Sequence, residues 1–214
     1  MTAEILEEIA VTLSELEDSA KIRGLIDKAL AQRVPVAEII EEGLRKGLDL
    51  VGKKYENGVF FLAELLYAGS IMNDALQMLR SNLDLKGVEP KGVVVLGTVR
   101  GDMHDIGKNI FKMFAIASGF EVHDLGVDVE PETFVDKLRE TKAEILGLSS
   151  LLTTTLWEIK NVIEKLNKAG MRDGVKVLIG GNAVTKDFAR EVGADEVALD
   201  AVEGVKICRR WVGK

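Results

Sequence analysis

Apolar residues recur at intervals of three and four positions through the first part of the chain, with polar residues between them. This spacing places apolar side chains on one face of a helix, and Ile5, Ile9 and Leu13 form the first such stripe. Pro35 suits the first turn of a third helix, and Asn57-Gly58 indicates the end of that helix before a fourth one. The pattern predicts a four-helix bundle whose stripes form its core.

The pattern changes beyond a short stretch, 86–91, whose glycine and proline indicate a linker. Short continuous apolar runs follow, as expected for strands that are buried on both faces, and helical patterns alternate with them. This alternation predicts a parallel sheet that is covered by helices on both faces. The expected strands are 93–96, 120–125, 144–148, 175–179 and 196–199, and the expected helices are 109–118, 131–141, 156–169, 183–192 and 201–211.

Together the two patterns predict an α/β fold class with two domains. The first, 1–86, is the N-terminal four-helix bundle. The second, 91–214, is a doubly wound, Rossmann- or flavodoxin-like domain with a parallel five-stranded sheet. The composition agrees with this fold, because 47% hydrophobic and 29% charged residues in a chain of 214 are typical of globular proteins.

Charge and cysteine content narrow the partners and the compartment. The net charge of -7 disfavours nucleic acid, because binding to phosphates needs the opposite sign. No apolar run approaches the ~20 residues of a membrane span, and the acidic start of the chain does not resemble a signal peptide. Cys208 has no second cysteine with which to form an internal disulfide. We therefore expect a cytoplasmic protein that binds neither nucleic acid nor a membrane.

Candidate chemistry gathers in the loops that follow three of the expected strands. These loops are 101–107 after the first strand, 149–155 after the third, and Gly180-Gly181 after the fourth. Open parallel sheets bind ligands at the carboxyl ends of their strands, so the loops should meet at one edge. That edge offers one imidazole, several carboxylates, a cluster of hydroxyls and a bare glycine pair.

The residues at this edge disfavour several common kinds of site. A zinc site needs three or four protein ligands, but the chain has only two histidines, and His123 lies inside the second expected strand. The chain has no Gly-x-Gly-x-x-Gly motif or P-loop for a phosphate group, and its hydroxyl cluster contains no nucleophile elbow. The set does suit a metal that brings its own equatorial ligands, with His104 as axial ligand and Asp102 fixing the tautomer of His104.

These residues resemble the cobalamin-binding signature of methionine synthase and of the corrinoid proteins, and the resemblance covers nearly the whole chain. Its three elements are Asp102-x-His104-x-x-Gly107, Ser149-x-Leu151 and Gly180-Gly181. In that family the histidine binds cobalt from below, in place of the cofactor's own dimethylbenzimidazole. The resemblance implies that His104 is the lower axial ligand and that Asp102 orients it. It also implies that Thr155, a serine in methionine synthase, hydrogen-bonds Asp102.

The resemblance further implies which residues contact the cobalamin. In the family the nucleotide tail is buried in the sheet domain, and a helical cap covers the upper face of the cofactor. Ser149 and Thr153 are expected to line the tail pocket, and the glycine pair is expected to let the backbone approach the tail. The further residues are Gly101, Met103, Asp105, Ile106, Gly107, Leu151, Gly180, Gly181 and Ala201 in the sheet domain, and Glu41, Tyr55, Leu62 and Leu65 in the cap.

Simpler interpretations of several of these residues stay open. Thr155 suits a plain helix N-cap, and Asp105 suits a cap of the helix that follows it. Leu62 and Leu65 suit the core of the bundle, because an apolar stripe on a helix is core by default. Glu41 suits a surface acid.

The resemblance implies a stand-alone corrinoid component of an anaerobic methyltransferase system, not a complete enzyme. The chain shows neither the barrel of adenosylcobalamin mutases nor a basic DNA-binding domain, and it is too short for the substrate modules of methionine synthase. The implied cofactor is cobalamin, in methylated and reduced forms. One implied partner loads the methyl group from a methoxy compound, as in an O-demethylase, or from methanol or a methylamine. A second methyltransferase serves tetrahydrofolate or a thiol, and a reductive activator restores the cofactor.

Other functions are compatible with the same residues. A cobalamin store, chaperone or sensor would keep the cofactor site without methyl transfer, and a flavodoxin-like nucleotide binder would use the sheet without cobalt. The methyl donor and the acceptor leave no signature in the chain, because the partners choose them. A homodimer through the apolar N-terminal helices and internal packing of those helices both fit the pattern.

Overall fold

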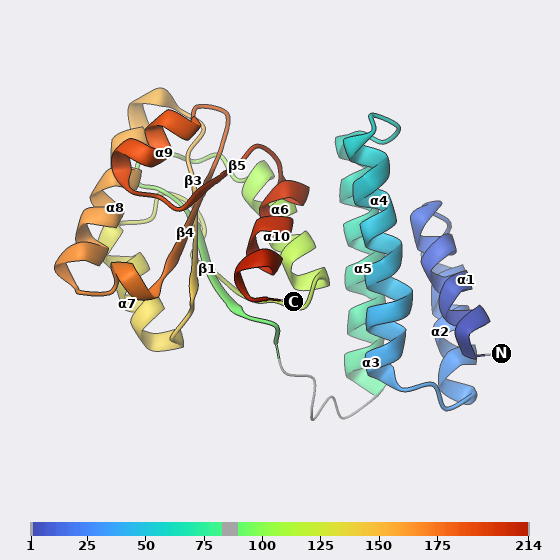
Figure 1. Cartoon of the computed structure of the whole chain (residues 1–214). Helices are drawn as coiled ribbons and strands as arrows, with labels where there is room; N and C mark the ends of the chain where they lie inside the picture. The colour runs from blue at the N-terminus through green and yellow to red at the C-terminus, as the bar shows by residue number, and fades with distance from the viewer. Residues whose placement is uncertain (1, 83–89, 214) are drawn as a thin grey trace. The chain divides into compact units, whose positions relative to one another are not determined.

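The computed structural model describes residues 2–82 and 90–213 and divides the chain into two compact units (Figure 1). One unit ends at Glu89, and the other begins at Pro90. The predicted linker, 86–91, lies for the most part outside the described residues. Within the described ranges, none of the helices is both long and apolar enough to span a membrane.

The first unit is helical, as the apolar spacing predicts. Ile9, Leu13 and Leu65 are among the side chains buried in its core. Helix α1 packs closely on α4 because Gly47 has no side chain: a Cβ there would lie 2.7 Å from the carbonyl oxygen of Ala10. The helices are α1 (Thr2–Ser14), α2 (Ser19–Ala31), α3 (Val36–Glu38), α4 (Lys46–Glu56) and α5 (Leu62–Asn82).

The expected third helix is present, but it is not a regular α-helix along its whole length. Pro35 is its N-cap, and the π-helical segment Ile39–Arg45 joins α3 to α4. An ion pair between Glu41 and Arg45 lies within this segment. The helix ends before Asn57-Gly58, as predicted, with Gly58 at a φ of +70°. The π-helical segment was not predicted, because Ile40, Leu44 and Leu48 recur at intervals that an ordinary α-helix also explains.

The second unit contains a five-stranded, all-parallel sheet in the order β2-β1-β3-β4-β5, which confirms the predicted sheet. Strand β1 pairs with both β2 and β3. The chain therefore crosses to one side of β1 to form β2 and to the other side to form β3. Sheets of this order bind ligands beside that switch point. The strands are β1 (Val93–Thr98), β2 (Glu121–Asp124), β3 (Ile145–Ser149), β4 (Lys176–Gly180) and β5 (Glu196–Ala198).

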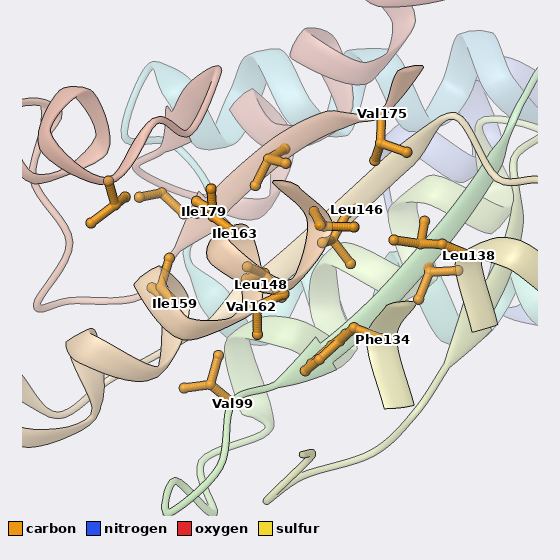
Figure 2. Close-up of a cluster of buried hydrophobic side chains, with 14 of the residues drawn as sticks. Val99, Phe134, Leu138, Leu146, Leu148, Ile159, Val162, Ile163, Val175 and Ile179 are labelled. Carbon is orange, nitrogen blue, oxygen red and sulfur yellow. The ribbon is translucent and has the colours of Figure 1, made fainter. Parts of the chain in front are cut away.

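Helices cover both faces of this sheet, with α6 and α10 on one face and α7, α8 and α9 on the other (Figure 1). A large apolar cluster fills the second interface, and Phe134 of α7, Leu148 of β3 and Ile159 of α8 belong to it (Figure 2). The helices are α6 (Ile106–Ala117), α7 (Pro131–Thr141), α8 (Leu156–Lys168), α9 (Lys186–Val192) and α10 (Ala201–Trp211).

Two helices start at positions that differ from the prediction. Helix α9 starts at Lys186 and not at Ala183, since the Thr185 side chain accepts a hydrogen bond from the Phe188 N–H and caps the helix there. Helix α6 starts at Ile106, so the last part of the histidine motif is helical.

Candidate cofactor site

The carboxylate of Asp102 joins the two loops that carry the candidate chemistry. Its side chain is fully buried. Oδ1 accepts hydrogen bonds from the His104 N–H at 3.0 Å, and His104 Nδ1 lies 2.7 Å from the same oxygen. Oδ2 accepts from the N–H groups of Leu151 at 2.7 Å and Leu152 at 3.3 Å, and from Thr155 Oγ1 at 3.2 Å. The loop after β1 and the loop after β3 are thus held together by one buried anion.

This arrangement fixes the charge of Asp102 and the tautomer of neutral His104. Burial raises the pKa of Asp102, but hydrogen bonds from His104, Leu151 and Leu152 outweigh it and lower the pKa to about 2. The carboxylate is therefore ionised at neutral pH and can only accept hydrogen bonds. The Nδ1 of a neutral His104 must donate to it, which places the lone pair of the ring on Nε2. The His104 side chain is about half exposed, at 52%, so this nitrogen is available to a ligand.

A second hydroxyl supports the contact between Thr155 and Asp102. Thr155 Oγ1 lies 2.9 Å from Ser150 Oγ, and both side chains are buried. Thr155 precedes α8, but its side chain makes no capping hydrogen bond there, because it bonds Asp102 and the Leu152 carbonyl instead. The plain N-cap interpretation is therefore wrong. Ser150 was missed, since nothing in the hydroxyl run 149–155 shows which members turn inward.

A cavity of about 560 Å³ opens beside His104 at the carboxyl edge of the sheet, on the face covered by α6 and α10. It brings together ten of the sequence-predicted residues: Met103, His104, Asp105, Ile106, Gly107, Ser149, Leu151, Gly180, Gly181 and Ala201. Four other candidates in the sheet unit do not line it. Asp102 and Thr155 lie behind the imidazole, Gly101 lies in the turn before it, and Thr153 is exposed. The placement of Thr153 in the pocket is thus not supported.

Glycines shape this cavity, in two different ways. A Cβ at Gly147, which sequence analysis missed, would lie 2.8 Å from Leu96 Cδ1, so the bare backbone of β3 keeps the wall of the cavity open. Gly181 has a φ of +120°, and a Cβ there would lie 2.0 Å from the Ser150 carbonyl oxygen. Gly181 therefore allows the loop after β4 to pack against the loop after β3, where a side chain would clash with the backbone of Ser150. At Gly180 the nearest atom to a Cβ is 3.6 Å away.

Apolar side chains stand exposed around the mouth of the cavity. Met103 is 68% exposed, Ile106 65% and Leu199 72%. Such exposure is typical of a surface that a ligand covers. The site thus combines a half-exposed imidazole, an apolar rim and a slot that a Cβ at Gly147 would narrow. These features fit a large, flat cofactor with a tail, such as cobalamin. Leu199 was missed because the sequence places it inside the last expected strand, 196–199, whereas β5 ends at Ala198.

The remaining candidates in the sheet unit have local partners. Asp105 makes no capping hydrogen bond at the start of α6, but its carboxylate accepts one from Asn109 Nδ2 at 2.9 Å and faces the cavity. His123 Nε2 lies 2.9 Å from Glu121 Oε1 within β2. Burial raises the pKa of the Cys208 thiol to about 12, so this cysteine stays protonated in α10.

The four candidates in the helical unit have different environments. Leu65 is buried in the bundle core, as its spacing alone predicts, whereas Leu62 is 46% exposed. Glu41 forms its ion pair with Arg45, and Tyr55 is partly buried. Their contact with a cofactor stays a prediction. Sequence analysis missed an exposed apolar group at the start of α5: Val59, Phe61, Leu66 and Tyr67.

Comparisons with known proteins identify the family to which each unit is similar. The B12 binding domain family matches residues 92–206, and a second family of B12 binding domains matches residues 6–80. The chain is 42% identical to dimethylamine corrinoid protein 3 of Methanosarcina acetivorans over 86% of each chain. It is 36% identical, over 100% of both chains, to a corrinoid protein of Desulfitobacterium hafniense.

Two solved structures resemble the whole chain. A cobalamin-binding protein from Desulfitobacterium hafniense is 40% identical with a TM-score of 0.82, over 96% of this chain and 98% of that one. The methanol:cobalamin methyltransferase complex from Methanosarcina barkeri is 27% identical with a TM-score of 0.86, over 98% of this chain and 80% of that one.

Proposed function

The chain belongs to the cobalamin-binding corrinoid proteins, and from this premise we propose that it carries a methyl group between two partner methyltransferases. The observation that carries the proposal is the 2.7 Å contact between His104 Nδ1 and the buried Asp102 carboxylate. It prepares an imidazole for one axial bond and keeps a compensating anion behind it.

When bound, the corrinoid supplies a cobalt centre that accepts and releases a methyl group. His104 Nε2 would hold that cobalt, with Asp102 fixing the plane and tautomer of the ring. The ionised Asp102 carboxylate also lies where it would stabilise positive charge on the His104 ring. Thr155, hydrogen-bonded to Ser150, keeps that carboxylate in place.

The cavity beside His104 would hold the nucleotide tail. Ser149 offers a hydroxyl at its mouth, while Leu96, Gly147 and Leu178 give it apolar walls. An apolar slot suits the aromatic base at the end of the tail, because its faces and edges are mostly hydrocarbon.

Partner methyltransferases would choose the donor and the acceptor. Several relatives are named dimethylamine or trimethylamine corrinoid proteins, and one structural neighbour is a methanol:cobalamin methyltransferase complex. We therefore favour a methylamine or methanol as donor, with a folate or thiol acceptor, and a reductive activator as third partner.

The first test replaces the proposed ligand. His104→Ala should shift the visible spectrum of bound cobalamin to that of a species without a lower ligand, while the fold survives. His123→Ala is the matched control, because it removes the other imidazole and should leave the spectrum unchanged. Identical spectra for His104→Ala and the unsubstituted protein would exclude His104 as the ligand.

The second test distinguishes a methyl-carrier protein from a protein that only stores or senses cobalamin. The reduced, cobalamin-loaded protein is mixed with a dimethylamine- or methanol-specific methyltransferase and its substrate, and the spectrum is followed for methylation. A carrier is methylated and then demethylated on addition of the second methyltransferase and its acceptor. A storage or sensor protein binds the cofactor equally well but does not turn over with any such pair.

A further inference from the structure

The loop between β2 and α7 holds the turn that carries Asp102. Asp128 Oδ1 accepts a hydrogen bond from the Gly101 N–H at 2.6 Å, and the Asp128 N–H donates to the Asp102 carbonyl oxygen at 3.1 Å. One residue from a distant loop thus binds the N–H on one side of the turn and the C=O on the other. We propose that Asp128 is a positioning residue for the Asp102–His104 pair.

The turn itself makes this support important. It closes with a hydrogen bond from the Asp102 N–H to the Val99 carbonyl oxygen at 3.2 Å, and Gly101 has a φ of +77°. The Gly101 N–H points away from that hydrogen bond, toward the neighbouring loop. A carboxylate acceptor for such an N–H is worth more than a neutral one. Asp128 therefore holds the Arg100–Gly101 peptide through its side chain and the peptide that follows Asp102 through its backbone N–H.

The conformation of Asp128 also fits a specific role. It has a φ of +54°, in the left-handed region that few residues other than glycine adopt, and its side chain is exposed. Aspartate and asparagine tolerate this region better than most side chains. Because the Asp128 side chain is exposed, core packing does not explain why an aspartate stands at this strained position. Its hydrogen bond with the Gly101 N–H does explain it.

Any movement of the turn should be transmitted to the imidazole. Asp102 contacts His104 through two hydrogen bonds to the same oxygen, one from the backbone and one from the ring. The ring therefore follows the carboxylate. Loss of the Asp128 clamp should loosen the orientation of His104 without removing any atom that touches it.

Three variants of Asp128 separate the contribution of its acceptor oxygen from that of its strained backbone. Asp128→Asn keeps an acceptor oxygen and tolerates positive φ, whereas Asp128→Gly removes the acceptor and relieves the backbone. Asp128→Ala is a second loss variant, and Asp136→Ala removes an exposed carboxylate of α7 as the matched control. The chain has only two histidines, so ¹⁵N NMR of the imidazoles resolves His104 from His123.

In the cofactor-free protein we expect Asp128→Gly and Asp128→Ala to lower the fraction of His104 in the Nδ1–H tautomer at fixed pH. With cobalamin bound, the ratio of histidine-ligated to unligated cofactor should fall roughly tenfold, the size expected for one charge-assisted hydrogen bond. Asp128→Asn keeps a neutral acceptor, so it should lose only about threefold in the ligation ratio and a smaller part of the tautomer fraction, and Asp136→Ala should change neither.

Unchanged His104 signals and an unchanged ligation ratio in both loss variants would overturn the inference. An equal loss in Asp128→Asn would also overturn it, because an acceptor oxygen at this position would then not be what holds the turn. The ligation readout rests on the proposed role of His104, but the tautomer readout does not. If His104→Ala left the cobalt spectrum unchanged, the proposed ligation would fail while NMR still tested Asp128.

Discussion

At the residue scale, hydroxyl groups support the buried anion of the site. Thr155 Oγ1 has the Asp102 carboxylate on one side and Ser150 Oγ on the other. Because all three groups are buried, each depends on the others for its hydrogen bonds. The network therefore acts as a unit.

We expect Thr155→Val, which preserves shape but removes the hydroxyl, to lower the free energy of unfolding by about 1 to 3 kcal/mol, because it leaves buried polar groups unsatisfied. It should leave cobalamin bound and shift the cobalt reduction midpoint. Thr155→Ser should restore both. Denaturant unfolding and a redox titration measure the two effects. Additive effects of Thr155→Val and Ser150→Ala would contradict a shared network.

Gly147 should decide whether a tailed corrinoid fits. In Gly147→Ala the new methyl group would push Leu96 toward the cavity, since they would otherwise lie 2.8 Å apart. We expect affinity for cobalamin to fall roughly tenfold or more, given the usual cost of overpacking, while affinity for cobinamide, which lacks the nucleotide tail, changes little. Absorbance titrations measure both. Gly174→Ala, where a Cβ meets nothing within 4 Å, is the control. Equal losses for the two corrinoids would exclude the slot as the tail site.

At the scale of elements, a single glycine sets the packing of α1 on α4. A Cβ at Gly47 would lie 2.7 Å from the Ala10 carbonyl oxygen, so the helix backbones would have to separate. We expect Gly47→Ala to destabilise the protein by about 1 to 3 kcal/mol. Gly24→Ala in α2, where a Cβ meets nothing, should stabilise it by about 0.5 to 1 kcal/mol. Denaturant unfolding measures both changes in stability. Equal changes for the two variants would show that the close approach of Gly47 to Ala10 does not limit how α1 packs on α4.

The edge of the sheet opposite the site is held by another carboxylate. Asp195 accepts a hydrogen bond from the Val177 N–H at 2.8 Å and lies 2.8 Å from Arg172 Nη2 and 3.1 Å from Lys176 Nζ. Partial burial raises the pKa of Asp195, but the Val177 N–H and the two cations outweigh it and lower the pKa below its ordinary value. The ionised form is therefore the one that stabilises the fold.

Because the folded pKa is depressed, the contribution of Asp195 is fully present above the ordinary carboxyl pKa of 3.8 and is lost as the pH falls below it. Asp195→Asn should therefore be less stable by about 1 to 2 kcal/mol at neutral pH, and the difference should shrink in acid. Unfolding curves across pH measure it. Asp187→Asn, on an exposed helix surface, should change little at any pH. A pH-independent difference for Asp195→Asn would contradict this assignment.

At the scale of the whole molecule, the core and the candidate site of the sheet unit both lie within it. Residues 90–214 expressed alone should therefore fold cooperatively and bind cobalamin with the spectrum of the full chain. The resemblance to methionine synthase implies that the helical unit protects reduced cobalt, so the shortened protein should be oxidised faster in air. Calorimetry and the rate of the spectral change measure these. Equal oxidation rates for the shortened protein and the full chain would show that the helical unit does not protect reduced cobalt.

The sequence by itself determined the elements, their order and the edge at which the chemistry gathers. Apolar spacing is a local property, so it predicts each helix and strand from its own residues. The parallel alternation then brings the carboxyl ends of all strands to one edge, which is why His104, Ser149 and Gly180 could be placed together before any contact was known.

Only the tertiary structure decided which side chains reach across that edge. Thr155 contacts Asp102, and Asp128 contacts Gly101, through hydrogen bonds between distant loops. Ser150 turns inward while Thr153 stays exposed, although both belong to one hydroxyl run. Which side chain turns inward depends on strand register and loop packing. The spacing of apolar residues along the chain predicts neither of these. The lining of the cavity follows for the same reason, because its walls come from strands that meet only after the sheet has formed.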